Sequence, residues 1–394
     1  MTPTENNRYK NLAIYALTVL LSVLLLWAGR GYASQLRTQF LELHPQPVHT
    51  YTPNQRARIR EILFVDSHQS IPVILPDGDL FIVTTTAISF LAELDAGGVV
   101  SGIQSFTDFM GSWPEREIQV GDHVILQYSS LDGHHQVVGF VRINYILILA
   151  GVVLVAIVGF GRWQGLNSLV ALGFTVAAIF VVFVPVVLYG GNPYVWALVV
   201  SVYATLSTLL IVIGANKKAL ATIMGTLLAV GVTAMLTVFM SRIMGMTGLL
   251  SPEDMNMLLY NPNLNLNAIV FAGIVLGALG ATMDVCMSIA SSLWEVSQTN
   301  KNAFGELYRS GIAIGKDILG TMANTLVLAY MGSYLTVILL LNTVYAHNIA
   351  NVFYLEPIIA ELLRALVGVF GIFLAIPITT LTCAWLYGKD AQLN

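Results

Sequence analysis

The stretch GALGATMDVCMSIASSLWEV, residues 277–296, decides the fold class, because it is a long apolar segment that contains a single aspartate, Asp284. An α-helix needs about 20 mainly apolar residues to cross a bilayer. An aspartate at the centre of a bilayer costs about 2.5–3.5 kcal/mol on insertion scales. The stretch therefore predicts a membrane-spanning helix in which Asp284 has a role that offsets this cost.

The composition of the whole chain agrees with a membrane protein. Of its 394 residues, 56% are hydrophobic and 10% are charged, whereas about 25% of the residues of a soluble domain are charged. No Lys/Arg run indicates nucleic-acid binding, and no Walker-type loop, Ser/His/Asp arrangement or Cys/His zinc spacing predicts a catalytic site or a cofactor. Cys286 and Cys383 are interpreted as small apolar side chains. His134 and His135 are adjacent, so in a strand they would point to opposite faces and hold no common metal ion.

Eight apolar stretches predict an α-helical membrane bundle of about eight helices. The first, Leu12–Ala28, forms an N-terminal anchor within residues 1–30, and a cleaved signal peptide is the alternative. The other seven make up a bundle over residues 143–388. They are Asn144–Gly161, Leu166–Tyr189, Tyr194–Gly214, Ala219–Met240, Asn267–Leu293, Gly311–Leu341 and Ile358–Tyr387.

Residues 31–142 form the one polar region, and we expect it to be a small extracytoplasmic β-rich barrel or sandwich inserted after the first helix. Short runs of β-branched and aromatic residues alternate there with turns that contain Gly, Pro and Asp. Either Ala87–Leu94 or Asn54–Ile62, the segment that leads into the first β-type run, could be helical. The β-type runs are RIREILFV (58–65), IPVIL (71–75), LFIVTTTAI (80–88), VILQY (124–128) and QVVGFVRI (136–143).

The charges of the short loops predict the orientation. Loops on the cytoplasmic side of a membrane carry an excess of Lys and Arg. Eight spans with both termini in the cytoplasm place Glu356, and Glu253 and Asp254 with Arg242, outside. The same arrangement places these basic residues inside: Arg162, Lys217, Lys218, Lys301, Arg309 and Lys389.

Small and polar residues share one face of the helix around Asp284. At 100° per residue they fall within about 40° of one line, and Val275, Ile289 and Leu293 occupy the opposite side. We expect this stripe to face the bundle interior, where glycines let another helix approach closely; a plain packing seam is the alternative. The stripe consists of Gly273, Gly277, Gly280, Asp284, Ser288, Ser291 and Glu295.

The next apolar span carries a second polar face. Asp317, Thr321 and Asn324 stand at i, i+4 and i+7 and therefore share one side of the helix. We expect Asp317 to face the stripe of the preceding helix. Lys316 points about 100° away from this polar face. We expect it to belong to the polar path, and the alternative is that its side chain extends to the cytoplasmic surface. Gly311 and Gly315 repeat the spacing of close helix packing.

In the last span, Glu361 and Arg364 stand at i and i+3. They form either an ion pair within the helix or the outer part of a polar network. With Glu361 outside, Asp284 central, and Asp317 and Glu295 inside, the ionisable groups form a broken line through the bundle. Such a line is typical of a path for an ion such as H⁺ or Na⁺, or for a polar substrate.

Three segments resemble the YibE/F-like family of bacterial integral membrane proteins. They are residues 277–296, RSGIAIGKDILGTMANTLVLAYMG (309–332) and ELLRALVGVFGIFLAIPITT (361–380), and the resemblance covers most of the chain from about residue 115. It implies a multi-pass protein of the bacterial plasma membrane and names no substrate. The helix of Asp284 and its successor are also similar to the membrane core of RND and SecDF-type proteins, where intramembrane aspartates carry protons. This chain departs from that core in its larger number of later spans and its smaller outside domain.

These patterns leave three functional hypotheses. The leading one is an ion-coupled transporter, or an export component driven by the proton-motive force, that is not an enzyme. The second is a non-transporting module that anchors a partner-binding β domain. The third is an intramembrane aspartyl protease, which the absence of a Gly-x-Gly-Asp arrangement disfavours. The expected partners are the lipid bilayer, H⁺ or Na⁺, and either a further copy of the chain or another membrane protein.

Overall fold

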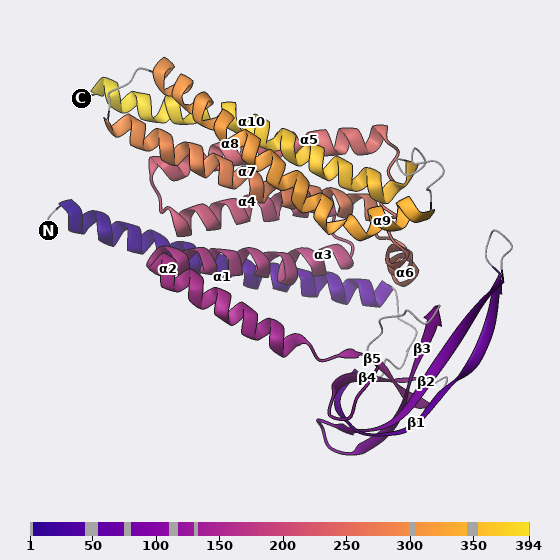
Figure 1. Cartoon of the computed structure of the whole chain (residues 1–394). Helices are drawn as coiled ribbons and strands as arrows, with labels where there is room; N and C mark the ends of the chain where they lie inside the picture. The colour runs from indigo at the N-terminus through magenta and orange to yellow at the C-terminus, as the bar shows by residue number, and fades with distance from the viewer. Residues whose placement is uncertain are drawn as a thin grey trace. The chain divides into compact units, whose positions relative to one another are not determined.

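The computed structural model describes residues 3–43, 54–74, 80–109, 117–129, 133–299, 304–344 and 354–393. The chain divides into two compact units (Figure 1). One unit is Gln46–Ala156, and the other combines Met1–Pro45 with Ile157–Asn394. The first contains a β-barrel and the second contains a bundle of long helices.

The β-rich unit is a closed five-stranded barrel with the strand order β1-β2-β3-β5-β4. Neighbouring strands are antiparallel except for β3 and β5, which form a short parallel pairing at Gly102 with His135 and Ile103 with Gln136. Closure removes the exposed strand edges that would otherwise pair with other chains. The strands are β1 (Gln55–Ile74), β2 (Leu80–Leu94), β3 (Val99–Phe109), β4 (His123–Ser129) and β5 (His134–Phe140).

Alternation along the strands builds the barrel core. On β2, Ile88, Phe90 and Ala92 are buried because side chains two residues apart point to the same face of a sheet. Val124 and Leu126 repeat this spacing on β4, and both are fully buried. The interior is therefore filled by apolar side chains, as expected for a small barrel.

The barrel confirms one of the two architectures expected for this region and corrects several details. Ala87–Leu94 and the residues after Asn54 lie in strands, so the prediction of a helix in either place was wrong. The strand Val99–Phe109 was missed, because its apolar residues are interrupted by Ser, Gln, Thr and Asp. The expected polar region began at residue 31, whereas the first helix continues to Leu43.

The second unit consists of helices, and the part of α2 up to Ala156 belongs to the barrel unit. The first helix, α1, is followed after the barrel by α2, which leads through the π-helix η1 into α3. The helices are α1 (Pro3–Leu43), α2 (Ile143–Ala177), η1 (Ala178–Phe183), α3 (Val184–Leu188), α4 (Pro193–Val212), α5 (Lys217–Ile243), α6 (Pro252–Tyr260), α7 (Leu266–Thr299), α8 (Phe304–Ser333), α9 (Leu335–Val344) and α10 (Glu356–Leu393).

In the described part of the chain, seven helices are long and apolar enough to cross a membrane. One of them, Ile143–Leu188, has 46 residues and contains two of the expected spans. At 1.5 Å per residue it would be about 69 Å long if straight, roughly twice the thickness of a bilayer core. Arg162 interrupts it with a positive φ of 47°. The chain folds back there and brings Gly165 close to Ile157. A Cβ at Gly165 would lie 3.1 Å from the carbonyl carbon of Ile157.

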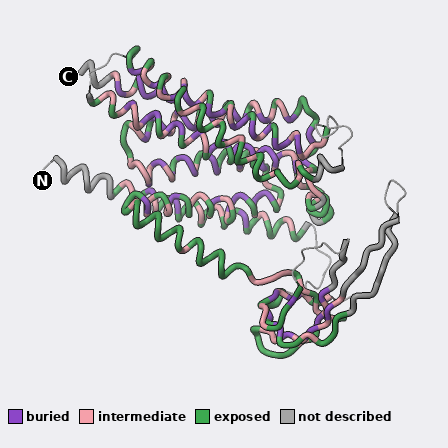
Figure 2. Tube along the Cα trace, in the orientation of Figure 1, coloured by how far each residue is buried: buried purple, intermediate pink, exposed green. Residues whose placement is uncertain are grey.

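Helices α5, α7, α8 and α10 form the centre of the bundle, where α10 packs against the other three (Figure 1). Helix α4 packs on α7. Buried residues follow the inner faces of these helices (Figure 2). The start of α10 is tied to the loop after α5, because the Glu356 carboxylate accepts hydrogen bonds from the Thr247 and Gly248 amides at 2.6 Å each. The Thr247 hydroxyl donates a third, at 2.7 Å.

Candidate functional site

Helix α7 has one buried side and one open side, and the polar stripe lies on the open side. Val275, Ile289 and Leu293 are fully buried within the bundle. The prediction that the stripe faces the interior was therefore wrong for the single chain: the large apolar residues fill the core and leave the small and polar ones outside. Gly273, Gly277, Gly280, Asp284, Ser288 and Glu295 are exposed, and Ser291 is half-buried.

Side chains from two other helices nevertheless reach over one end of this stripe. A Cβ at Gly277 would lie 2.8 Å from the Tyr330 hydroxyl of α8. A Cβ at Gly273 would lie 3.5 Å from Nη2 of Arg364 on α10. The glycines thus leave room for an arginine and a tyrosine, whereas a Cβ at Gly280 would meet no atom within 4 Å.

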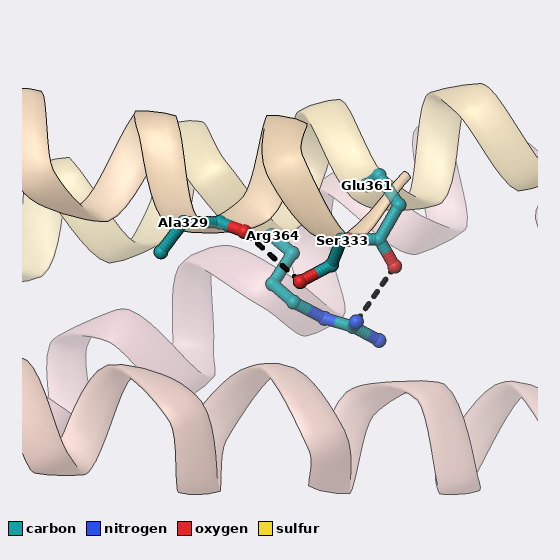
Figure 3. Close-up of polar contacts among 4 residues, drawn as sticks. All are labelled: Ala329, Ser333, Glu361 and Arg364. Carbon is teal, nitrogen blue, oxygen red and sulfur yellow. Dashed lines mark hydrogen bonds and ion pairs between the residues drawn. The ribbon is translucent and has the colours of Figure 1, made fainter. Parts of the chain in front are cut away.

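Arg364 forms an ion pair with Glu361 on the same helix. Its Nη1 lies 2.6 Å from Oε1 of Glu361. Figure 3 shows the arginine side chain extending from α10 past Ser333 of α8, with its guanidinium group at the Glu361 carboxylate. Tyr330 of α8 also approaches both neighbouring helices: a Cβ at Gly277 of α7 would lie 2.8 Å from its hydroxyl, and a Cβ at Gly368 of α10 would lie 4.0 Å from its Cε2. This confirms the pairing within the helix and also places the pair beside α7 and α8.

The pair has unused hydrogen-bonding capacity. Glu361 is 8% exposed, and among the described residues neither its Oε2 nor Nε of Arg364 has a hydrogen-bond partner. A buried polar atom without a partner loses its hydration without compensation. The Glu361 carboxylate is therefore equipped to take up a proton, a cation or a hydrogen-bond donor.

Asp284 is separate from this pair. It stands seven residues beyond Gly277, or about 10 Å further along α7. It is exposed, and within the described ranges it forms no hydrogen bond or ion pair. No hydrogen bond joins it to Asp317 in that part of the chain, so the two carboxylates do not form the proton-sharing pair of an aspartyl protease.

The polar face of α8 is directed away from the bundle. Gly311 and Gly315 are buried, where a Cβ would collide with Thr380 and Ile376 of α10, so their predicted role in close helix packing is confirmed. The glycine side of α8 therefore faces α10, and the opposite side is open. Lys316, Asp317, Thr321 and Asn324 are all exposed, which corrects the expectation that Asp317 faces α7.

A column of hydroxyl groups inside the bundle was not predicted. It follows the buried face of α5, where Thr233 faces α10 and α7: a Cβ at Gly371 would lie 2.8 Å from the Thr233 hydroxyl and 3.4 Å from that of Thr282. The recurrence of hydroxyl residues every four or seven positions was the signal available in the sequence. The column is Thr222, Thr226, Thr233, Thr237 and Ser241, all at most 6% exposed.

A hydroxyl of α10 beside the column contacts one of the two buried cysteines. The Thr379 hydroxyl of α10 donates to the Cys286 sulfur of α7 at 3.0 Å. Cys286 and Cys383 are both free and fully buried. Most threonine hydroxyls of the column donate to a carbonyl one turn earlier on their own helix, as Thr233 does to Ala229 at 2.8 Å. The column therefore provides close packing without charge, and the ionisable residues lie elsewhere.

A cavity of about 590 Å³ lies in the barrel unit. Its lining carries both signs of charge, including Arg56, Arg142, Asp95, Asp122 and His123. This mixture selects no single class of charged ligand. In the part of the chain that the structure describes, no three His, Cys, Asp or Glu side chains lie close enough to hold a metal ion.

Comparison with known families gives one match. A family model described as YibE/F-like protein matches residues 149–389, which is more than half of the chain. The matched region contains the Glu361–Arg364 pair, the stripe of α7 and the open face of α8. No curated protein and no solved structure matches the chain.

Proposed function

Since this chain belongs to the YibE/F-like protein family, we propose that it is a multi-pass membrane protein that moves protons or small cations across the bacterial plasma membrane. In this proposal the 46-residue segment around Arg162 crosses twice, which makes eight crossings with both termini in the cytoplasm. The apolar helices support the membrane location. The direction of transport and any coupled substrate are outside the proposal.

The observation that carries the proposal is the Glu361 carboxylate. It is 8% exposed, one of its oxygens pairs with Arg364, and the other has no partner among the described residues. Ionisable residues inside membrane segments are rare because they are costly, and they mark ion and proton paths. When the Arg364 guanidinium moves away, the charge of Glu361 loses its compensation in a medium of low dielectric, and binding a proton or cation restores it.

Asp284 is the second step of the proposed path. The stripe of α7 leads from the Arg364 side chain at Gly273 to Asp284, through positions with little or no side chain. The Arg364 and Tyr330 side chains lie over Gly273 and Gly277, and the space at Gly280 beside Asp284 is open to water or a hydrated ion. Asp317 on α8 and Glu295 near the end of α7 are the remaining carboxylates expected on the cytoplasmic side. Ser288 supplies an uncharged polar group on α7, and Thr321 and Asn324 supply such groups on the open face of α8.

Reconstitution into liposomes tests the proposal. A proton or sodium gradient is imposed, and flux is followed with a dye enclosed in the vesicles. The wild type should conduct, and both Glu361→Gln and Asp284→Asn should reduce flux to the level of empty liposomes. Glu253→Gln, which removes an exposed carboxylate of α6, is the matched control and should conduct normally. Wild-type flux in Glu361→Gln would contradict the proposal.

A second candidate function is that of a membrane anchor for a partner-binding barrel. The observation that favours it is the position of Asp284, which has an open side in the single chain instead of an enclosed polar cavity. In that case neither the wild type nor the variants would conduct in the same assay. The charged cavity of the barrel, with Arg56 and Arg142, would then be the place to seek the partner.

A further inference from the structure

The open side of α8 carries a regular seam. Its residues are spaced by three or four positions, which is the repeat of a helix that packs along a second helix. All are exposed except Ser310, which is half-buried. We call this set the outer seam: Ser310, Ala313, Asp317, Thr321, Asn324, Leu328 and Met331.

The outer seam differs from an ordinary lipid-facing surface. Helix α1 is also largely exposed, but its exposed side chains in the membrane segment are apolar, such as Leu20, Leu24 and Trp27. The middle of the outer seam instead presents Asp317 and Asn324. Neither forms a hydrogen bond or ion pair within the described residues. Lipid tails offer such groups no partner, so a bilayer favours any protein surface that covers them.

We propose that the outer seam is the interface of a homodimer in which α8 packs in parallel against α8 of a second copy. All copies of a membrane protein share one orientation, so the two-fold axis runs along the membrane normal and places identical residues at equal depth. An asparagine amide both donates and accepts, so two Asn324 side chains satisfy each other. A buried asparagine in such a seam also fixes the register of the two helices.

Charge complementarity favours a second copy over a different membrane protein. Lys316 flanks the outer seam, about 100° from Asp317 around the helix, and is exposed. In a parallel pair it lies at the depth of the other copy's aspartate, so Lys316 of each chain meets Asp317 of the partner subunit. Two ion pairs form by symmetry, while Leu328 and Met331 pack in the apolar part of the same seam.

Cysteine cross-linking in native membranes tests the dimer. In a background with Cys286→Ala and Cys383→Ala, Thr321→Cys places a thiol in the outer seam. Met322→Cys places one at the same depth, about 140° from the centre of the seam, and Met322 is 39% exposed. Oxidation should link two copies through residue 321 and not through residue 322, because a disulfide requires Cβ atoms about 4 Å apart. Equal linking at both positions, or none at 321, would overturn the proposal.

A second variant measures the strength of the seam. Asn324→Leu should raise the dissociation constant of the dimer in detergent or bilayers by about threefold to thirtyfold, the range of a hydrogen bond between membrane helices. Met322→Ala, about 140° from the centre of the seam on the same helix and 39% exposed, should leave it unchanged. A monomeric wild type, or a cross-link from residue 321 to a different protein, would refute the homodimer. These readouts are masses and association constants, so they are independent of ion flux.

Discussion

The Arg364 guanidinium lies 2.6 Å from the Glu361 carboxylate on α10 and also lies over Gly273 of α7, where a Cβ would be 3.5 Å from it. One side chain thus links a buried carboxylate of α10 to the stripe of α7. Ser333 of α8 lies beside it (Figure 3). A change in the pairing of Arg364 would therefore alter its contacts with three helices, α7, α8 and α10.

Removal of the arginine charge should destabilise the bundle. In Arg364→Met, the apolar stem is kept while Glu361 remains buried without its cation. Breaking a buried pair in this way costs about 3–5 kcal/mol, and the 24% exposure of the Arg364 side chain places the expected loss near the lower end. Thermal unfolding in detergent measures it. The double variant Arg364→Met with Glu361→Gln should recover most of the loss, and an equally unstable double variant would contradict this account.

Substitution of Asp284 should separate function from stability. Because its carboxylate is exposed and has no described partner, Asp284→Asn should change the free energy of unfolding by no more than about 0.5 kcal/mol, as surface substitutions usually do. The same variant should lose ion flux under the transport proposal. Unfolding and flux measured on one preparation give both values. A large loss of stability would indicate a hidden structural partner.

The contact between α5 and α10 depends on Gly225. A Cβ there would lie 3.0 Å from the Cβ and 3.2 Å from the Cα of Thr379, so the backbones of the two helices would have to separate. Gly225→Ala should destabilise the bundle by about 1–3 kcal/mol, the usual cost of overpacking. Gly231→Ala on the same helix adds its methyl group in open space, and should be neutral or stabilise by up to about 1 kcal/mol. Matched melting curves compare them.

The sequence predicted the architecture well, because apolar length and two-residue alternation are local signals. The long helices and the barrel follow from them. Helical spacing offered the pairing of Glu361 with Arg364 as one of two interpretations, and the structure contains it. The stripe around Asp284 was identified correctly as one face of a helix.

The direction of that stripe could not be read from one helix. Small residues permit close packing, as Gly311 and Gly315 do against α10, but equally occupy an open face, as Gly280 does. Which side of α7 faces the interior depended on where the larger side chains, such as Ile289 and Leu293, could pack. The same holds for Asp317: its opposite side carries the glycines that pack on α10, and this turns the carboxylate outward.

The barrel contains one close approach that a single methyl group should disrupt. Among the described residues, strands β3 and β5 pair at two positions, Gly102 with His135 and Ile103 with Gln136. A Cβ at Gly102 would lie 2.7 Å from the His135 carbonyl oxygen and 2.8 Å from Cε2 of Phe90, which is fully buried. Neither the strand backbone nor the packed ring can move freely, so Gly102→Ala should open this pairing at a cost of about 1–3 kcal/mol.

Hydrogen exchange on the full chain measures this effect at the closure of the barrel. The amides around Ile103 and Gln136 should exchange faster in Gly102→Ala, because β3 and β5 separate first when the short parallel pairing weakens. Gly139→Ala on β5 is the control, since its methyl group meets no atom within 4 Å, and it should exchange as the wild type does. Unchanged protection in Gly102→Ala would mean that Phe90 shifts to admit the methyl group, and the glycine would then not be required for closure.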